Sequence, residues 1–254
     1  MRDDFAVFIL SHGRSDRVFT LKPLFDGGYT GKWYIVIDDE DDQADDYFKR
    51  YGEHVYQFSK AAYDDTFDIM DLHTDRRVVV YARNACFDIA KELGIRYFLV
   101  LDDDYNAFMY RFPEGDVLKY ADCKQLDDLF EAMVDFLIVS KSLSIAFAQG
   151  GDFIGGLKGG GFQKKLIRKV MNTWFCDAEK PFKIIGRINE DTNSTDIYLD
   201  RGTYVKSFYT VMCAPSCCKI SAMGDKHIRV HHKVDWSACT PKIINEKWKK
   251  TGRK

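Results

Sequence analysis

Hydrophobic residues occur in three uninterrupted runs, and each run ends in a polar or acidic turn. The runs cover residues 5–10, 33–37 and 97–101, and none is long enough to cross a bilayer. Short continuous apolar runs are typical of strands that are buried on both faces of a parallel sheet. We therefore expect three inner strands of one sheet.

Helical patterns alternate with these runs. The pattern predicts helices over residues 16–24 and 83–93. The first is closed by Gly27-Gly28, and the second is followed by Gly94 as its C′ residue. This alternation predicts an α/β fold with a mixed, mostly parallel central sheet and helices on both faces. Ligands of such sheets bind at the carboxyl ends of the strands, where all three runs end in polar residues.

The pattern after residue 104 is more mixed. It predicts, in order, a helix, a short strand, a glycine-rich loop and two further strands: 125–142, 144–148, 149–161, 183–188 and 204–214. The loop lacks the Gly-Lys-Ser/Thr ending of a phosphate-binding P-loop. We expect it to be either a mobile wall of a binding site or a flexible linker.

Composition fits a globular protein, with 46% hydrophobic and 30% charged residues. A chain of 254 residues can bury the core of one α/β domain, which we place at residues 1–235, followed by a basic tail at 236–254. The seven cysteines include no CxxC pair, so a disulfide framework and a zinc site are not expected. Without a basic-then-apolar leader pattern, the expected location is the cytoplasm.

Charge is unevenly distributed along the chain, although its net value is only −2. Residues 219–254 contain ten Lys or Arg against three Asp or Glu, and residues 164–169 form a second basic run. Residues 38–46 are strongly acidic. This split suits a polyanionic partner on the basic side; a solvated helix face and a frayed tail are the alternative.

Three adjacent aspartates, Asp102, Asp103 and Asp104, follow the third apolar run. Their carboxylates repel one another unless a cation neutralises them. Alternation along an extended segment points Asp102 and Asp104 to one side and Asp103 to the other. Oxygen ligands suit Mg²⁺ or Mn²⁺, which can bridge a diphosphate and stabilise its departure. We predict a metal site at Asp102 and Asp104; a solvated turn is the alternative.

These residues resemble a known family. Residues 98–104 (Phe-Leu-Val-Leu-Asp-Asp-Asp) resemble the DxD strand of GT-A glycosyltransferases, and Tyr-Ala-Arg-Asn-Ala at 81–85 resembles the helix start that precedes that strand. With Gln-Gly-Gly-Asp at 149–152 and Asn-Glu-Asp-Thr at 189–192, the order over residues 5–235 is similar to phage TET-associated DNA-base glycosyltransferases and the base J glucosyltransferase.

The resemblance implies a GT-A fold and metal-assisted transfer of a sugar from a UDP-sugar. The acceptor it implies is the hydroxymethyl group of a pyrimidine in phage DNA, such as 5-hydroxymethylcytosine, inside an infected host cell. The implied donor-binding residues are Ser11, His12, Gly13, Arg14, Asp38, Asp39, Arg83, Asn84, Asp102 and Asp103. Helix capping and a surface ion pair are the alternative roles for Arg83 and Asn84.

Further residues take roles from the same resemblance. Asp191 is the first candidate for the carboxylate base of an inverting reaction, with Glu190 and Asp196 behind it; a helix N-cap is the alternative. Either His231 or His232 could join the metal site, unless both are surface residues.

The implied acceptor site consists of residues from the glycine-rich loop and from the basic run at 164–169. Its candidates are Gly151, Asp152, Lys164, Lys165, Arg168 and Lys169. The cations could pair with backbone phosphates of DNA, whose target base would have to be extruded from the duplex.

Three other functions remain open at this point. The first is a GT-A glycosyltransferase with a saccharide, protein or small-molecule acceptor. The second is a nuclease or nucleotidyltransferase that uses the three aspartates to hold metal. The third is a catalytically silent binding module. Intact Asp102 and Asp104 argue against the third.

Overall fold

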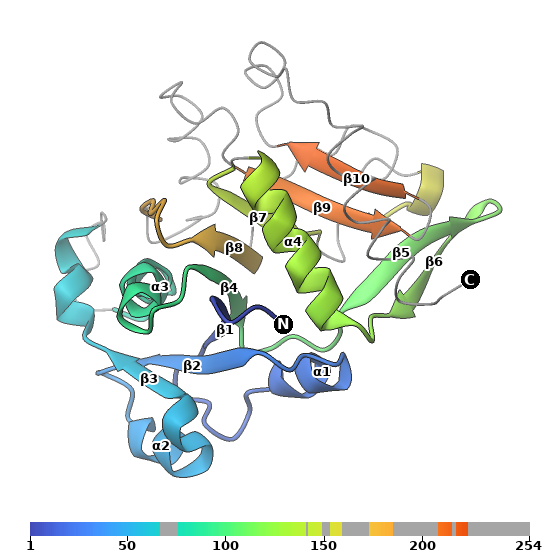
Figure 1. Cartoon of the computed structure of the whole chain (residues 1–254). Helices are drawn as coiled ribbons and strands as arrows, with labels where there is room; N and C mark the ends of the chain where they lie inside the picture. The colour runs from blue at the N-terminus through green and yellow to red at the C-terminus, as the bar shows by residue number, and fades with distance from the viewer. Residues whose placement is uncertain are drawn as a thin grey trace.

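The computed structural model describes residues 1–66, 76–140, 142–148, 153–158, 173–184, 208–214 and 217–222. Its main sheet has the strand order β10-β9-β7-β8-β4-β1-β2-β3 (Figure 1). The strands are β1 (Phe5–Leu10), β2 (Lys32–Asp38), β3 (Val55–Phe58), β4 (Tyr97–Asp102), β7 (Ser144–Phe147), β8 (Thr173–Asp177), β9 (Phe208–Ala214) and β10 (Cys217–Ala222).

Helices and one hairpin complete the described fold. The α-helices are α1 (Leu21–Asp26), α2 (Ala44–Tyr51), α3 (Val80–Glu92) and α4 (Leu126–Ser140). The 3₁₀ helices are η1 (Gly52–His54), η2 (Lys60–Thr66) and η4 (Gly156–Lys158), and the hairpin pairs β5 (Met109–Glu114) with β6 (Val117–Asp122). No described helix is long and apolar enough to span a membrane.

The sheet is mixed but mostly parallel. β1 pairs in parallel with β2 and β4, and β2 pairs in parallel with β3. β8 runs antiparallel to both β4 and β7, β9 is parallel to β7, and β10 is antiparallel to β9. Only β8 and β10 therefore oppose the other strands of this sheet. The predicted α/β class with a mixed, mostly parallel sheet is confirmed.

β1 is the centre of the parallel part, and all six of its residues are buried. Leu10, its last residue, lies opposite Val36 of β2 and Asp102 of β4. The carboxyl ends of these three strands therefore lie side by side at one edge of the sheet. Whatever follows each strand is brought to the same place.

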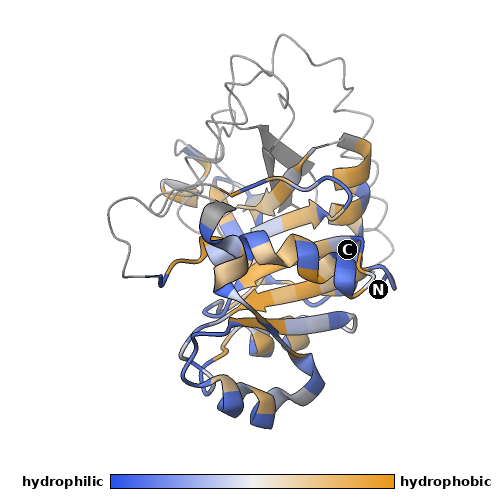
Figure 2. Ribbon diagram, turned by 90° about the vertical axis from the view of Figure 1, so that its left-hand side faces the viewer, coloured by the Kyte–Doolittle hydropathy of each residue, from blue (hydrophilic) through white to orange (hydrophobic). Residues whose placement is uncertain are grey.

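The two faces of β1 pack against different helices, as continuous apolar strands require. Phe5, Val7 and Ile9 belong to a core cluster shared with α1, α2 and α4. Ala6 and Phe8 belong to a second cluster shared with α3. The hydrophobic strands accordingly lie between helical layers, as the hydropathy colouring in Figure 2 shows.

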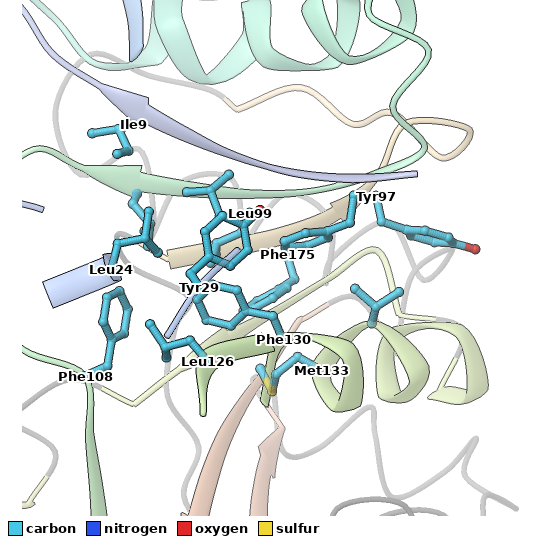
Figure 3. Close-up of a cluster of buried hydrophobic side chains, with 14 of the residues drawn as sticks. Ile9, Leu24, Tyr29, Tyr97, Leu99, Phe108, Leu126, Phe130, Met133 and Phe175 are labelled. Carbon is cyan, nitrogen blue, oxygen red and sulfur yellow. The ribbon is translucent and has the colours of Figure 1, made fainter. Parts of the chain in front are cut away.

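Phe130 of α4 lies at the centre of the first cluster (Figure 3). Its ring centroid is 5.4 Å from that of Tyr29, 6.0 Å from Phe5 and 5.8 Å from Phe175. Aromatic pairs at these separations add to the burial of apolar area. α4 is therefore held to the sheet largely through this one side chain and its neighbours.

Several predicted boundaries need correction. The helix expected over 16–24 begins only at Leu21, because Thr20 is committed to the end of β4: its N–H donates to the Asp103 carbonyl and its hydroxyl to the Asp102 carbonyl. The helix expected from residue 83 begins at Val80, which is fully buried.

The structure describes only part of the elements that were expected after residue 104. The helix expected over 125–142 ends at Ser140, and the strand expected over 144–148 is β7. Of the strand expected over 183–188, Lys183 and Ile184 lie outside any strand and the rest lies outside the described residues. The strand expected over 204–214 is confirmed from Phe208 onward.

Truncating Phe130 tests this account of the core. We expect Phe130→Ala to lower the free energy of unfolding by about 3–5 kcal/mol, because it removes a fully buried ring. Phe48→Ala, at a 42% exposed position on α2, should cost less than about 1 kcal/mol. Urea denaturation measures both, and equal losses would contradict the account.

Candidate functional site

A cleft of about 530 Å³ opens at the carboxyl ends of β1, β2, β3 and β4. Side chains that follow these strands form one part of its wall, and the start of α3 with the residues before it forms the other. The lining residues are Leu10, Ser11, His12, Arg14, Val36, Asp38, Phe58, Lys60, Arg77, Val78, Val79, Ala82, Arg83, Asp102, Asp103 and Asp104.

Asp103 is a buried carboxylate of this cleft, with 4% of the residue exposed. One carboxylate oxygen accepts a hydrogen bond from Ser11 Oγ at 2.6 Å, and the other accepts one from Arg14 Nη1 at 2.8 Å. Charge-assisted bonds of this kind offset the cost of burying the carboxylate. Asp103 therefore joins the turn after β4 to the loop after β1.

The Tyr47 hydroxyl extends this contact to α2. Ser11 Oγ lies 2.6 Å from it, and since the one serine hydrogen is donated to Asp103, Tyr47 donates to Ser11. The same phenol oxygen accepts the Arg14 N–H at 2.9 Å. Burial raises the pKa of Tyr47, so its hydroxyl stays protonated as a donor.

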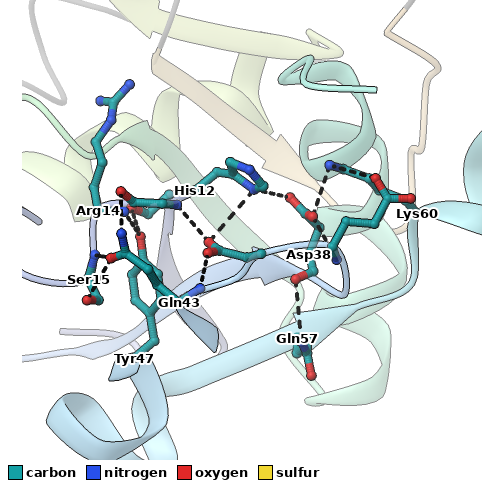
Figure 4. Close-up of polar contacts among 12 residues, drawn as sticks. His12, Arg14, Ser15, Asp38, Gln43, Tyr47, Gln57 and Lys60 are labelled. Carbon is teal, nitrogen blue, oxygen red and sulfur yellow. Dashed lines mark hydrogen bonds and ion pairs between the residues drawn. The ribbon is translucent and has the colours of Figure 1, made fainter. Parts of the chain in front are cut away.

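His12 and Asp38 form a second polar group on the β2 side of the cleft (Figure 4). His12 Nδ1 lies 2.8 Å from Asp38 Oδ2 and 3.7 Å from Asp41 Oδ2. The buried ammonium of Lys60 lies 2.9 Å from Asp38 Oδ1. Asp38 is thus held from both sides, by an imidazole and by an ammonium group.

Gly13 gives the loop after β1 its shape. Its φ of +65° is a left-handed conformation that favours glycine, and its N–H donates to Asp41 Oδ2 at 2.8 Å. Gln43 holds the next turn, since its side-chain oxygen accepts from the Ser15 N–H at 3.0 Å. The loop is therefore fixed by backbone hydrogen bonds to side chains that follow β2.

Arg83 and Asn84 are the fourth and fifth residues of α3 and have different surroundings. Arg83 is buried, with Nη2 lying 3.5 Å from Asp102 Oδ1 and its guanidinium 5.8 Å from the Trp174 ring. The Asn84 side chain both donates to the Ile184 carbonyl, at 3.1 Å, and accepts the Ile184 N–H, at 2.8 Å. Arg83 lines the cleft, whereas Asn84 connects α3 to the segment after β8.

The aspartates on either side of Asp103 face the cleft more openly. The Asp102 side chain is 29% exposed and Asp104 is exposed. Alternation predicted this contrast with Asp103. Within the described ranges, no three His, Cys, Asp or Glu side chains gather to hold a metal ion.

Asp39 lies apart from the cleft lining. Its Oδ1 accepts the Lys60 N–H at 2.9 Å at the start of η2. Burial acts to raise the pKa of Asp39, but hydrogen bonds from the Ser59 side chain and the Lys60 backbone lower it overall. Of the donor-site candidates, Gly13, Asp39 and Asn84 are the three that do not line the cleft.

The remaining candidates lie outside the described residues. They are the proposed bases Glu190, Asp191 and Asp196, the histidines His231 and His232, and the acceptor-site residues Gly151, Asp152, Lys164, Lys165, Arg168 and Lys169.

Sequence reasoning missed four polar residues of this site: Asp41, Gln43, Tyr47 and Lys60. Lys60 follows β3, which has only four residues, of which the first and last alone are buried, so the pattern is too short to stand out. Predicting β3 would have placed Lys60 at the same sheet edge as Asp38. Tyr47 reads locally as an ordinary apolar position of α2, and only the fold brings it to Ser11.

The chain is similar to known proteins in sequence and in fold. The family model described as TET-Associated Glycosyltransferase matches residues 5–224. No curated protein matches. The crystal structure of S. aureus TarS residues 1–349 is similar at 11% identity and a TM-score of 0.42, covering 88% of this chain. This chain spans 61% of that structure.

Removing the Tyr47 hydroxyl tests the hydrogen bonds that connect α2 to the loop after β1. Tyr47→Phe should lower the free energy of unfolding by about 1–3 kcal/mol, because the Arg14 N–H and Ser11 Oγ lose a buried partner. Tyr34→Phe is the matched control, since no hydrogen bond joins its hydroxyl to another described residue. A control as costly as Tyr47→Phe in urea denaturation would contradict this role.

Proposed function

Since the chain belongs to the TET-associated glycosyltransferase family, we propose that it transfers a sugar from a UDP-sugar to a hydroxymethylated pyrimidine in DNA. Family membership confirms the resemblance that the motifs indicated. The chain is accordingly a nucleotide-sugar-dependent glycosyltransferase. The observation that carries the donor assignment is the cleft at the carboxyl ends of parallel strands, which combines the buried cations Lys60 and Arg83 with the half-buried Asp102 and the exposed Asp104.

The two ends of the cleft suit the two halves of such a donor. Toward β2 and β3 the lining includes Val36 and Phe58 beside His12 and Asp38, which suits a nucleoside. Toward β4, Arg83 lies near the acidic run, which suits a diphosphate and its cation. Arg14, anchored on Asp103 with half of its side chain exposed, can reach the phosphates from the β1 loop.

Mg²⁺ or Mn²⁺ fits the residues at the β4 end. Such cations are commonly bound through one or two carboxylates, with water and substrate phosphates completing the shell. Asp102 and Asp104 would supply these carboxylates, and His231 or His232 would add a ligand. Asp103 is committed to Ser11 and Arg14. When bound, the cation would offset the charge that develops on the departing diphosphate.

The transfer itself exchanges one bond for another at the anomeric carbon. Asp191, or in its place Glu190 or Asp196, would take the proton of the acceptor hydroxyl as its oxygen bonds to that carbon. The bond from the carbon to the diphosphate oxygen breaks with its electron pair, and UDP leaves. Arg83 would stabilise the phosphate nearest to the breaking bond.

DNA carrying 5-hydroxymethylcytosine is the proposed acceptor. The family description, with its reference to TET, supports a modified base. The basic residues Lys164, Lys165, Arg168 and Lys169 would pair with backbone phosphates beside the loop that contains Gly151 and Asp152. The base would be extruded so that its hydroxymethyl group reaches the cleft.

The transfer can be measured by mass spectrometry of nucleosides from hydroxymethylcytosine-containing DNA incubated with UDP-sugars and Mn²⁺. We expect one sugar to be transferred, and Asp102→Asn or Asp104→Asn to lower kcat about 100-fold, equal to about 2.7 kcal/mol of transition-state stabilisation. Asp116→Asn, in the exposed turn of the β5–β6 hairpin, is the control and should retain full activity.

The outcomes of this experiment test the acceptor and the metal site separately. Transfer to a saccharide, protein or small molecule but not to DNA would refute the acceptor. Unchanged rates in both aspartate variants would refute the metal site.

DNA binding tests the basic run independently. Changing Lys164, Lys165, Arg168 and Lys169 together to Gln should weaken DNA binding and reduce the slope of log affinity against log salt by up to about 3–4. Lys22, Lys49, Arg50 and Lys91, all exposed on helices, provide a charge-matched control. Fluorescence anisotropy at several salt concentrations measures both, and equal slopes would refute the proposed contact.

A further inference from the structure

Both carboxylate oxygens of Asp38 have polar partners within the protein. Oδ1 accepts from the Lys60 ammonium at 2.9 Å and from the Glu40 N–H at 3.1 Å. Oδ2 lies 2.8 Å from His12 Nδ1. The Asp38 side chain is also 9% exposed, so a ligand in the cleft meets its neighbours first.

This environment fixes the orientation and tautomer of His12. A carboxylate only accepts hydrogen bonds, so His12 Nδ1 must carry the hydrogen that it shares with Asp38. In the neutral imidazole, Nε2 is then an acceptor. The His12 side chain is 38% exposed and lines the cleft, and no described residue forms a hydrogen bond with Nε2.

Lys60 makes this arrangement stable. It is 3% exposed, and its ammonium lies 2.9 Å from Asp38 and 3.4 Å from Glu40. A buried ammonium requires such partners. Lys60 therefore balances the charge of Asp38 from the side away from His12, so that the carboxylate can hold the imidazole without itself facing the ligand.

The His12 side of the cleft is also the side that suits a planar ring. In the sheet order, β2 and β3 lie on one flank of β1, and β4 with its acidic run lies on the other. Val36 and Phe58, near the ends of β2 and β3, line the cleft together with Val79 and Ala82. These apolar groups can cover the faces of a ring whose edge meets His12.

We propose that His12 reads the edge of the donor's nucleobase through Nε2, with Asp38 and Lys60 as the residues that position it. The inference rests on the proposed UDP-sugar donor. Uracil carries a hydrogen on N3 and can donate it to Nε2, whereas cytosine has a lone pair there. An acceptor at this position selects uracil and opposes cytosine.

Isothermal titration of the full chain with UDP and CDP in the presence of Mn²⁺ tests this selection. We expect wild type to bind UDP at least about tenfold more tightly than CDP, since the wrong base leaves polar groups unpaired. His12→Ala should weaken UDP binding and bring the ratio of the two dissociation constants close to one. 3-Methyluridine diphosphate, which lacks the N3 hydrogen, should bind wild type as poorly as CDP.

His54→Ala is the matched control. His54 also holds a backbone carbonyl through Nδ1, at 3.1 Å from Trp33 O, and its ring stacks on Trp33 at 3.8 Å, but it does not line the cleft. This variant should keep the wild-type preference for UDP. Loss of preference in His54→Ala as well would indicate a general effect of histidine removal and overturn the assignment.

The positioning role has its own spectroscopic readout. In protein with ¹⁵N-labelled histidine, the His12 resonances should show Nδ1 protonated and Nε2 unprotonated, and UDP should shift Nε2. Asp38→Ala and Lys60→Met should each disturb this pattern and reduce the UDP preference. A folded Asp38→Ala variant with the wild-type tautomer and preference would overturn the positioning role.

The outcomes distinguish this inference from the proposed function. If wild type prefers UDP and His12→Ala keeps that preference, the inference fails and the UDP donor stands. If wild type binds no uridine nucleotide, the UDP donor fails and the inference fails with it. Sugar transfer to DNA is measured separately, so an incorrect acceptor leaves the nucleotide preference unaffected.

Discussion

The pairing of one buried carboxylate holds the cleft together. Asp103 would be costly inside the protein without donors, and it obtains them from Ser11 and Arg14, about ninety residues earlier in the chain. Tyr47 supports Ser11 in turn. The turn after β4, the loop after β1 and helix α2 are consequently one hydrogen-bonded unit, which holds this part of the cleft lining in place.

Residues that are adjacent in the sequence have different roles in the cleft: some hold the structure in position, and others face the cleft. Asp103 points inward and anchors Arg14, while Asp102 and Asp104 remain accessible. Arg83 lines the cleft, while Asn84 ties α3 to the backbone of Ile184. A motif of adjacent polar residues is thus both scaffold and site, because alternate side chains of a strand or helix start face different surroundings. Substituting either kind of residue disturbs the cleft, but for different physical reasons.

Local pattern predicted the strands that consist of continuous apolar runs. Strands β1, β2 and β4 were found to within one residue, because both faces are apolar. Strand β3 has only four residues, of which the first and last alone are buried, so it was missed together with Lys60. The start of α1 was placed too early because Thr20 bonds to the end of β4, a contact between distant segments. Alternation did predict that Asp103 would face away from its neighbours, but not which residues would receive it.

Among the described residues, those that line the cleft fall between positions 10 and 104, although the sheet continues through β10. The described lining is therefore supplied by the first four strands of the chain, the segments that follow them and the start of α3. Among the described strands, a substitution in β7, β8, β9 or β10 can therefore act on this lining only through packing, and not by replacing a lining side chain.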